Sequence, residues 1–551
     1  MYVDSSTVKQ GDKSYTRYLL RECYRENGKV KHRTIANLSS CSDAEIAAIR
    51  LALRHKEQLA SLLSDKTTVT QKQGLSFGAV WIAYSIAREL GIVEALGTTR
   101  EGKLALWQVI GRVIDQGSRL SAVRLAGSHA ACDILSVGKF DENDLYDNLD
   151  WLAERQATIE DRLYRKLHGA EKSGLFLYDV TSSYLEGTEN ELSAFGYNRD
   201  GKKGKMQIVI GLLCDNEGTP LSVEVFTGNT QDPKTVGPQI KKVAERFGAK
   251  DVTFVGDRGM IKNGQIEALH AEPYGFHYIT AITKPQVENL LTRNIIQMNL
   301  FDQALAEVTT DDGTRYVLRR NPVRAKEMKA SREDKLATAR RMIDERNCYL
   351  EEHPKANVAI ALRAISERTE RLKISDWAMA SANDRVLSIT VDAETLGEAE
   401  KFDGCYVLKT DLPVESASKE TIHDRYKDLT LVESAFRTSK TAELEVRPIH
   451  VRLATRTRGH VFVVMMAYRV VKELSRRWKQ LDVTVQEGLD ELSTLCAVEV
   501  GVNGSVRYNR IPEPRESLGK LLSAAGVRLP DILPSTGVKV TTKKKLPSRR
   551  K

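Results

Sequence analysis

A series of short apolar segments between residues 175 and 282 constrains the fold of this chain more than any other feature. Each segment is rich in aliphatic and aromatic residues and is bounded by polar or glycine residues, a pattern typical of buried strands. Helical spacing is found at 233–247 and 263–270. The order strand, strand, strand, helix, strand, helix, strand predicts an α/β domain built around one sheet. The five expected strands are Leu175–Tyr178, Gln207–Cys214, Leu221–Phe226, Val252–Val255 and His277–Ile282.

Two aspartates stand at the ends of expected strands. Asp179 follows the apolar residues of LFLYDVTSSY, and Asp257 follows those of VTFVGDRGM. In open α/β sheets the ligand crevice lies beyond the carboxyl ends of the strands, so two strand-end acids can meet there. Each acid alone is weak evidence, because aspartate is also a common turn residue.

A third acid, Glu433, lies among basic and aromatic residues in a helix predicted over Asp424–Lys440. On a helix, residues three, four and seven apart share a face, and here they are Tyr426, Glu433, Arg437 and Lys440. A bare carboxylate would repel DNA, whereas one that binds a divalent metal beside phosphate-binding cations makes chemical sense. The alternative is a solvated helix with an i,i+4 ion pair between Glu433 and Arg437.

The spacing of Tyr426, Glu433 and Lys440 resembles the Y-x6-E-x6-K frame of the YREK signature. This signature is found in insertion-sequence transposases of the IS-four-like superfamily, which is part of the DDE group. The resemblance spans roughly residues 170 to 470. Further similar segments occur in the same order along the chain: DVTSSYLEG, FGYNRDGKKGKMQIVIGLLCDNEGTPL, VFTGNTQDPKTV, VGDRGM and FDGCYVLKTDL.

The resemblance implies an α/β fold with a ribonuclease-H-like catalytic core, a strand-containing insertion and a helical N-terminal region before the core. It also implies that Asp179, Asp257 and Glu433 are the catalytic residues. Two Asp and one Glu are suitable ligands for two Mg²⁺ ions, with Mn²⁺ as the alternative. In this hypothesis Asp179 bridges the two ions, and Asp257 and Glu433 each complete one.

The DNA contacts implied by the same resemblance come from Tyr426, Arg437 and Lys440, which would hold phosphates near the scissile bond. The arginine of the signature falls on Leu429, so Lys427 or Arg425 is expected to supply its charge. Further candidate DNA-binding residues, which precede an apolar helix, are Arg452, Arg456 and Arg458. A solvated connector is the alternative interpretation of those three arginines.

The resemblance implies a DNA transposase that binds the terminal inverted repeats of its insertion sequence. The enzyme would cleave the DNA by metal-dependent hydrolysis and join the 3′-hydroxyl ends to target DNA. The same resemblance implies a homodimer in a synaptic complex as the working form. The alternatives are a divalent-metal nuclease without strand transfer and a catalytically idle DNA-binding relic. A glycosidase is disfavoured by an aromatic content of only 6% and by the basic C-terminal tail.

The N-terminal part begins with a hairpin signal at Asn27-Gly28, between expected strands near Tyr15–Arg25 and Lys29–Asn37. Ser42 and Glu45 form a capping box at the start of a helix. One interpretation of the hairpin is a ribbon whose basic side enters a major groove, and the other is an ordinary solvated face. The basic residues in question are Arg17, Arg21, Arg25, Lys29, Lys31 and Arg33.

The 175 residues between Asp257 and Glu433 exceed what one strand and one helix require, which predicts an insertion. We expect a strand-rich start, a charged helix at Ser331–Glu352, and short strands at Val358–Ile365 and Arg385–Val391. The expected boundaries are 1–63 for the hairpin and first helix, 75–168 for a helical DNA-end-binding region, 170–283 and 401–480 for the catalytic core, 284–400 for the insertion, and 481–551 for an accessory segment with a basic tail.

The net charge of +9 is local, because seven positive charges lie in the last fourteen residues. DNA affinity is therefore expected from that tail and from clustered faces rather than from the whole surface. The N-terminus lacks an apolar core for export, and the most apolar helix, HVFVVMMAYRVV, is too short to span a bilayer. We expect no membrane partner and a cytoplasmic protein that acts at the bacterial nucleoid.

Overall fold

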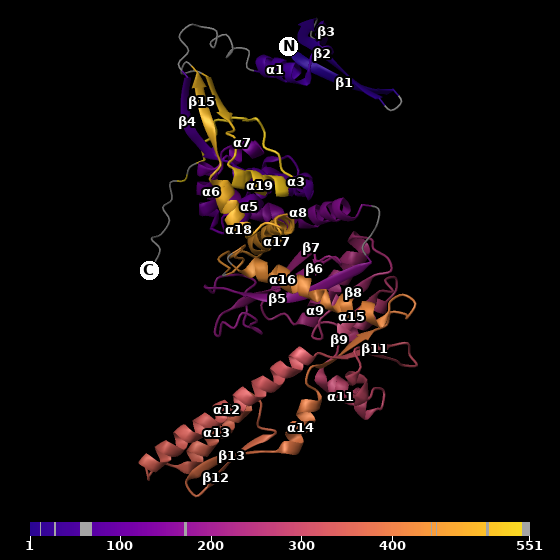
Figure 1. The fold of residues 1–551 in the computed structure, drawn as a ribbon, viewed down its shortest axis with the longest axis vertical. Helices are drawn as coiled ribbons and strands as arrows, with labels where there is room; N and C mark the ends of the chain where they lie inside the picture. Colours follow the sequence, from indigo (N-terminus) through magenta and orange to yellow (C-terminus); the bar gives the residue numbers. More distant parts are fainter. Residues whose placement is uncertain are drawn as a thin grey trace. The chain divides into compact units, whose positions relative to one another are not determined.

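The computed structural model describes residues 1–10, 13–26, 29–54, 69–169, 174–441, 443–447, 449–502, 506–540 and 542. They belong to two compact units, which are described separately (Figure 1). The first unit comprises Met1–Ile86, Gly117–Leu145 and Glu473–Lys551, and the second comprises Ala87–Gln116 and Tyr146–Lys472. The Asn27-Gly28 turn and most of the basic tail lie outside the described residues.

An eight-stranded mixed sheet in the order β10-β11-β14-β9-β8-β5-β6-β7 forms the centre of the second unit. Strand β8 pairs in parallel with β5 and β9, and all other neighbours are antiparallel. The strands are β5 Leu175–Tyr184, β6 Gln207–Cys214, β7 Pro220–Thr227, β8 Thr253–Gly256, β9 His277–Ala281, β10 Ala306–Thr309, β11 Arg315–Arg320 and β14 Cys405–Thr410. The predicted order of strands and helices from β5 to β9 is therefore confirmed.

Helices cover both faces of this sheet. The hydrophobic core on one face includes Tyr164 of α8 (Glu142–His168), whose ring stacks on Phe247 at 4.3 Å between centroids. The helices α9 (Asp232–Lys241) and α10 (Asn263–His270) also contribute to this core. The opposite face of β5 is contacted by α16 (Leu429–Lys440).

Tyr178 fixes the orientation of β5, because its side chain lies directly over Gly211 of β6. A Cβ atom at Gly211 would lie 2.3 Å from the Tyr178 hydroxyl oxygen, so a larger residue cannot occupy this position unchanged. Successive side chains of a strand point to opposite faces. The packing of Tyr178 on the α9 side therefore directs Asp179 to the face that α16 covers.

The segment between β11 and β14 contains the long helix α12 (Pro322–Glu352), α13 (Val358–Leu372), the hairpin β12–β13 (Ala378–Asn383 and Val386–Val391) and α14 (Ala393–Lys401). The charged helix and the strand near Val386 agree with the sequence, but the predicted strand at 358–365 is wrong. Asn357 caps a helix there, and Ala361, Ile365 and Thr369 are buried at helical spacing. The expected strand-rich start consists of the helix α11 (Lys284–Thr292) followed by β10 and β11, which extend the central sheet.

In the first unit, β1 (Tyr2–Gln10), β2 (Lys13–Glu26) and β3 (Lys29–Asn37) form an antiparallel sheet that precedes α1 (Asp43–Arg54). Directly opposite residues in such strands share a face. Lys31 pairs with Tyr24 and Arg25 pairs with Val30, so Lys31 and Arg25 lie on opposite faces. The interpretation in which all six basic residues line one side of the ribbon is therefore wrong.

A second sheet of this unit joins segments that are distant in sequence, in the order β17-β16-β15-β4, where β16 is Val506–Arg510 and β17 is Ile532–Leu533. Figure 1 shows β15 (Cys496–Val502) beside β4 (Val69–Ser76), with which it pairs. The helices of the unit include α3 Gly78–Glu89, α6 Arg119–Ser128, α7 Ala131–Leu135, α18 Val485–Ser493 and α19 Glu516–Ala524. Throughout the described part of the chain, every helix is too short or too polar to cross a membrane.

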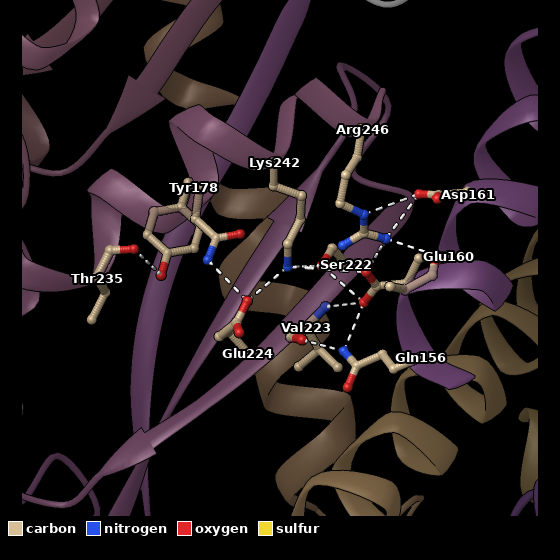
Figure 2. A network of polar contacts seen from close by, with 12 residues as sticks. Gln156, Glu160, Asp161, Tyr178, Ser222, Val223, Glu224, Thr235, Lys242 and Arg246 are labelled. Atoms are coloured by element: carbon tan, nitrogen blue, oxygen red, sulfur yellow. Dashed lines mark hydrogen bonds and ion pairs between the residues drawn. The ribbon is translucent and has the colours of Figure 1, made fainter. Parts of the chain in front are cut away.

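A buried polar network ties α8 to the edge strand β7 (Figure 2). The Glu160 carboxylate is only 1% exposed and accepts hydrogen bonds from Ser222 Oγ at 2.8 Å and Arg246 Nη2 at 3.1 Å. Lys242 Nζ donates to Ser222 Oγ and to Glu224 Oε2, at 2.5 and 2.7 Å. Lys242 and Arg246 lie on one π-helical turn that follows α9. The network therefore joins a helix, a strand and a turn around one buried carboxylate.

We predict that Glu160→Ala lowers the free energy of unfolding by about 3–5 kcal/mol, because it leaves buried cations without their anion. The matched control is Asp161→Ala, since Asp161 pairs with the same Arg246 but is 28% exposed. Loss of that pair should lower the stability by about 1 kcal/mol or less. Urea unfolding measures both values, and equal losses would contradict the central role of Glu160.

Candidate active site

The parallel pairing of β5 with β8 brings two of the predicted acids together. Tyr178 lies opposite Gly256, so the residues that follow them, Asp179 within β5 and Asp257 directly after β8, lie at the same level. Their side chains point to the same face of the sheet. The register of these two strands places the two acids side by side, as the sequence predicts. The prediction that both acids stand at strand ends is wrong for Asp179, because β5 continues to Tyr184 through its pairing with β6.

Two consecutive helices supply the third acid. The predicted continuous helix over 424–440 is wrong in detail, because α15 (Lys419–Lys427) and α16 meet at Asp428. Aspartate is a poor residue for a helix interior, and a one-residue break here separates the two helices. Glu433 on α16 is exposed, whereas Leu429, at the position of the arginine of the YREK signature, is buried. Leu429 therefore belongs to the core and offers no contact to phosphate.

Tyr426 connects these helices to Asp257. Its hydroxyl donates a hydrogen bond of 2.9 Å to Asp257 Oδ1, which also accepts one from the backbone N–H of Arg258. Burial raises the pKa of Tyr426, and the nearby carboxylates of Asp257 and Glu433 raise it further. Tyr426 thus remains a neutral donor over the physiological range of pH.

Asp179 is electrostatically coupled to both other acids. Burial raises its pKa from 3.8 to about 7, and the negative charges of Asp257 and Glu433 contribute to this rise. A hydrogen bond from the Val180 N–H and the positive charge of Arg199 act in the opposite direction. The charge of Asp179 is therefore repelled by the other two carboxylates, as expected of an acid with like charges nearby.

Lys440 lies on the same face of β5 and is held by two protein oxygens. Its Nζ donates to Thr181 Oγ1 at 2.6 Å and to Asp200 Oδ1 at 2.9 Å. Arg447 donates to the same Asp200 oxygen. The sequence does not point to Asp200, Arg199 or Thr181, and their only signal is their place within FGYNRDGKKGK and DVTSSY.

The other predicted DNA-binding residues have different surroundings. Arg456 binds Asp147 and Asp150 of α8, each at 2.8 Å, so its guanidinium takes part in helix packing. Lys427 Nζ lies 3.8 Å from Asp424 Oδ1. The other three predicted DNA-binding arginines, Arg437, Arg452 and Arg458, are exposed and form no side-chain hydrogen bond or ion pair with the described residues.

The three candidate acids are not arranged as a closed metal-binding site. Across the described ranges of the chain, no three acidic, His or Cys side chains converge closely enough to enclose a metal ion. The hydroxyl of Tyr426 donates its hydrogen bond to Asp257 Oδ1. The arrangement therefore consists of neighbouring carboxylates whose charges are only partly compensated by protein donors.

Comparison with known families identifies the chain. Residues 171–470, more than half of its 551 residues, match the family described as transposase DDE domain. The chain belongs to the DDE transposase family. Residues 3–66 of the transposase match the N-terminal domain of IS1634 family transposases. The resemblance stated from the sequence, to an insertion-sequence DDE transposase, is confirmed.

No curated protein matches this transposase. Among solved structures, one that is similar is a cryo-EM structure of the piggyBac transposase synaptic complex with hairpin DNA. The sequence identity is 8%, the TM-score is 0.36, and the match covers 75% of each chain.

The raised pKa of Asp179 predicts a pH-dependent cost in stability. Between pH 4 and 7 the folded protein retains a proton that the unfolded chain has lost, so folding becomes less favourable as the pH rises. Asp179→Asn removes this effect and should be more stable than the wild type at pH 8, by at most about 4 kcal/mol. The gain should be small near pH 4. Urea unfolding with a chelator at both values tests this, and a pH-independent difference would contradict it.

Proposed function

We propose that this transposase binds the terminal inverted repeats of its insertion sequence, cleaves the DNA by metal-dependent hydrolysis and joins the 3′-hydroxyl ends to target DNA. The observation that carries the proposal is the coupling of Asp179 to Asp257 and Glu433 within the matched DDE domain. These three residues are the proposed catalytic acids. Membership of the family supports DNA as the substrate.

The architecture of the second unit supports a ribonuclease-H-like catalytic core. Three strands are followed by alternating helices and strands, and the central pairs β5–β8 and β8–β9 are parallel. The elements between β11 and β14 support an insertion within this core, between the strand of Asp257 and the helix of Glu433. The helices within 75–168 are the proposed region for binding the DNA ends.

The donor set fits a divalent metal. Three carboxylates near one another, one with a pKa raised to about 7, form a site of excess negative charge that a hard cation would relieve. Mg²⁺ is the proposed ion and Mn²⁺ the alternative. Two such ions, when bound, would activate the attacking oxygen and neutralise charge on the leaving oxygen. Asp179, Asp257 and Glu433 would hold them.

The surrounding side chains suit the positioning of DNA. The Tyr426 hydroxyl holds Asp257 in place through its 2.9 Å hydrogen bond. Arg437 lies one helical turn after Glu433, and its exposed guanidinium has donors that can bind a phosphate in a bidentate manner. Lys440, on the following turn, supplies a second cation next to β5. Two ends must be brought together in transposition, so a homodimer is the proposed working form.

The reaction is tested with a labelled DNA that carries the element's own end, incubated with Mg²⁺. Asp257→Asn and Glu433→Gln should each reduce cleavage and joining by about 10²–10³-fold, because each removes a carboxylate that would hold a divalent ion, and with it the positive charge that would stabilise the transition state. The matched control is Asp424→Asn, an exposed acid on α15, which should retain activity. Equal activity in all three variants would refute the site, and cleavage without joining would favour the nuclease alternative.

Metal binding has a separate readout that does not depend on activity. At pH 8 a saturating divalent ion should raise the unfolding temperature of the wild type, because it binds the folded site and relieves repulsion around Asp179. At 100 times the dissociation constant the gain is about 2.7 kcal/mol. Glu433→Gln should lose most of this gain, and Asp424→Asn should keep it. Differential scanning calorimetry with and without Mn²⁺ provides the measurement, and an equal gain in both variants would exclude Glu433 as a ligand.

A further inference from the structure

Asp200 joins three separate segments of the chain at one buried carboxylate. Its side chain is 2% exposed, although it lies in a connection rich in glycine and lysine between β5 and β6. Its Oδ2 accepts a hydrogen bond of 3.1 Å from the backbone N–H of Tyr184, the last residue of β5. Its Oδ1 accepts from Lys440 and from Arg447. The carboxylate is thereby fixed relative to the strand that carries Asp179.

The local conformation of this connection places the carboxylate. The side chain of Asn198 accepts hydrogen bonds from the backbone N–H groups of Asp200 and Lys202, at 2.9 and 3.3 Å, which forms a tight turn. The Arg199 N–H donates to Ser182 Oγ at 2.9 Å, so the turn lies against β5. Asp200 is therefore held by backbone contacts that do not involve either cation.

The Asp200 carboxylate neutralises only one of the two cations that it binds. A buried carboxylate is costly unless it is paired, and here one carboxylate meets two cations, Lys440 and Arg447. The cluster keeps one net positive charge beside β5. Arg447 is 30% exposed, and the three donors of the Lys440 ammonium are not all used by Asp200 and Thr181. The cluster can therefore still bind an anion.

The position of Lys440 relative to the acids follows from its second bond. Thr181 lies two residues after Asp179, so their side chains share a face of the strand. The 2.6 Å bond from Lys440 Nζ to Thr181 Oγ1 places the ammonium on that face. A lysine side chain is flexible, and fixing it before DNA binds removes an entropic penalty from the reaction.

We propose that Asp200 is a positioning residue of the DNA-cleaving site, which fixes Lys440 beside β5 and recruits Arg447 so that both cations meet a DNA phosphate. The inference rests on the proposed function, since the phosphate belongs to the DNA that the three acids would cleave. Asp200 itself touches no substrate and acts through Lys440.

The test is a double-mutant cycle on metal-dependent cleavage of the labelled end. Asp200→Asn retains an acceptor for the Tyr184 N–H but loses the charge that holds Lys440, so the rate at saturating DNA should fall about 10- to 100-fold. In a Lys440→Ala background, the same substitution should change the rate by less than about twofold, because its effect passes through Lys440. Multiplicative losses in the double variant would overturn the inference.

A second variant and a control keep the test decisive if Asp200→Asn folds poorly. Thr181→Val removes the other bond to Lys440 without changing any charge, and it should slow cleavage only when Lys440 is present. Glu186→Gln is the control, because Glu186 pairs with Lys205 near the same connection, but with a side chain that is 49% exposed. Its rate should match the wild type.

The possible failures are distinguishable. If neither the wild type nor Glu186→Gln cleaves the DNA with Mg²⁺ or Mn²⁺, the proposed function fails. If both cleave and the folded Asp200→Asn and Thr181→Val variants cleave at the wild-type rate, only the role of Asp200 is refuted.

Discussion

The parallel pairing of β5 with β8 is the constraint on which the candidate site depends. It aligns Tyr178 with Gly256 and so sets Asp179 and Asp257 side by side. A slip of one residue would turn each side chain of β5 to the other face, because strand side chains alternate. The close contact between Tyr178 and Gly211 opposes such a slip, since only a glycine leaves room for the tyrosine ring. Packing on one face thus determines the chemistry available on the other.

The site that results is electrostatically unfavourable within the folded chain. The raised pKa of Asp179 reports burial together with repulsion from Asp257 and Glu433. Protein groups compensate only in part, through the Tyr426 hydroxyl and the charge of Arg199. Stability must therefore come from elsewhere, and the core between the sheet and α8, with the Glu160 network at its edge, supplies it. Functional sites often hold unfavourable interactions whose cost is offset by stabilising contacts elsewhere in the protein.

The sequence was sufficient for features that depend on local pattern. Apolar runs ended by turn residues located β5 to β9, and their order made the convergence of Asp179 and Asp257 predictable. The prediction of a strand at 358–365 was wrong because a short apolar run fits a strand or a helix equally well. The pairing of β15 with β4 could not be read locally, because its partners lie at opposite ends of the chain. The irregular register between β2 and β3 near Leu20 could not be predicted from the sequence either.

The partners of the basic residues could not be predicted from the sequence either, and they separate exposed cations from paired ones. A basic residue in a sequence gives no indication of which carboxylate lies near it, and Asp200 is 240 residues from Lys440. Arg456 and Lys440 are both bound to protein carboxylates, whereas the exposed Arg437 has no such partner among the described side chains. Exposed cations attract DNA over distances limited by salt screening, while buried and paired cations are held in one orientation. Long-range attraction to DNA and precise contact with one phosphate therefore require different surroundings, and the helix that carries Glu433 holds both an exposed cation, Arg437, and a paired one, Lys440.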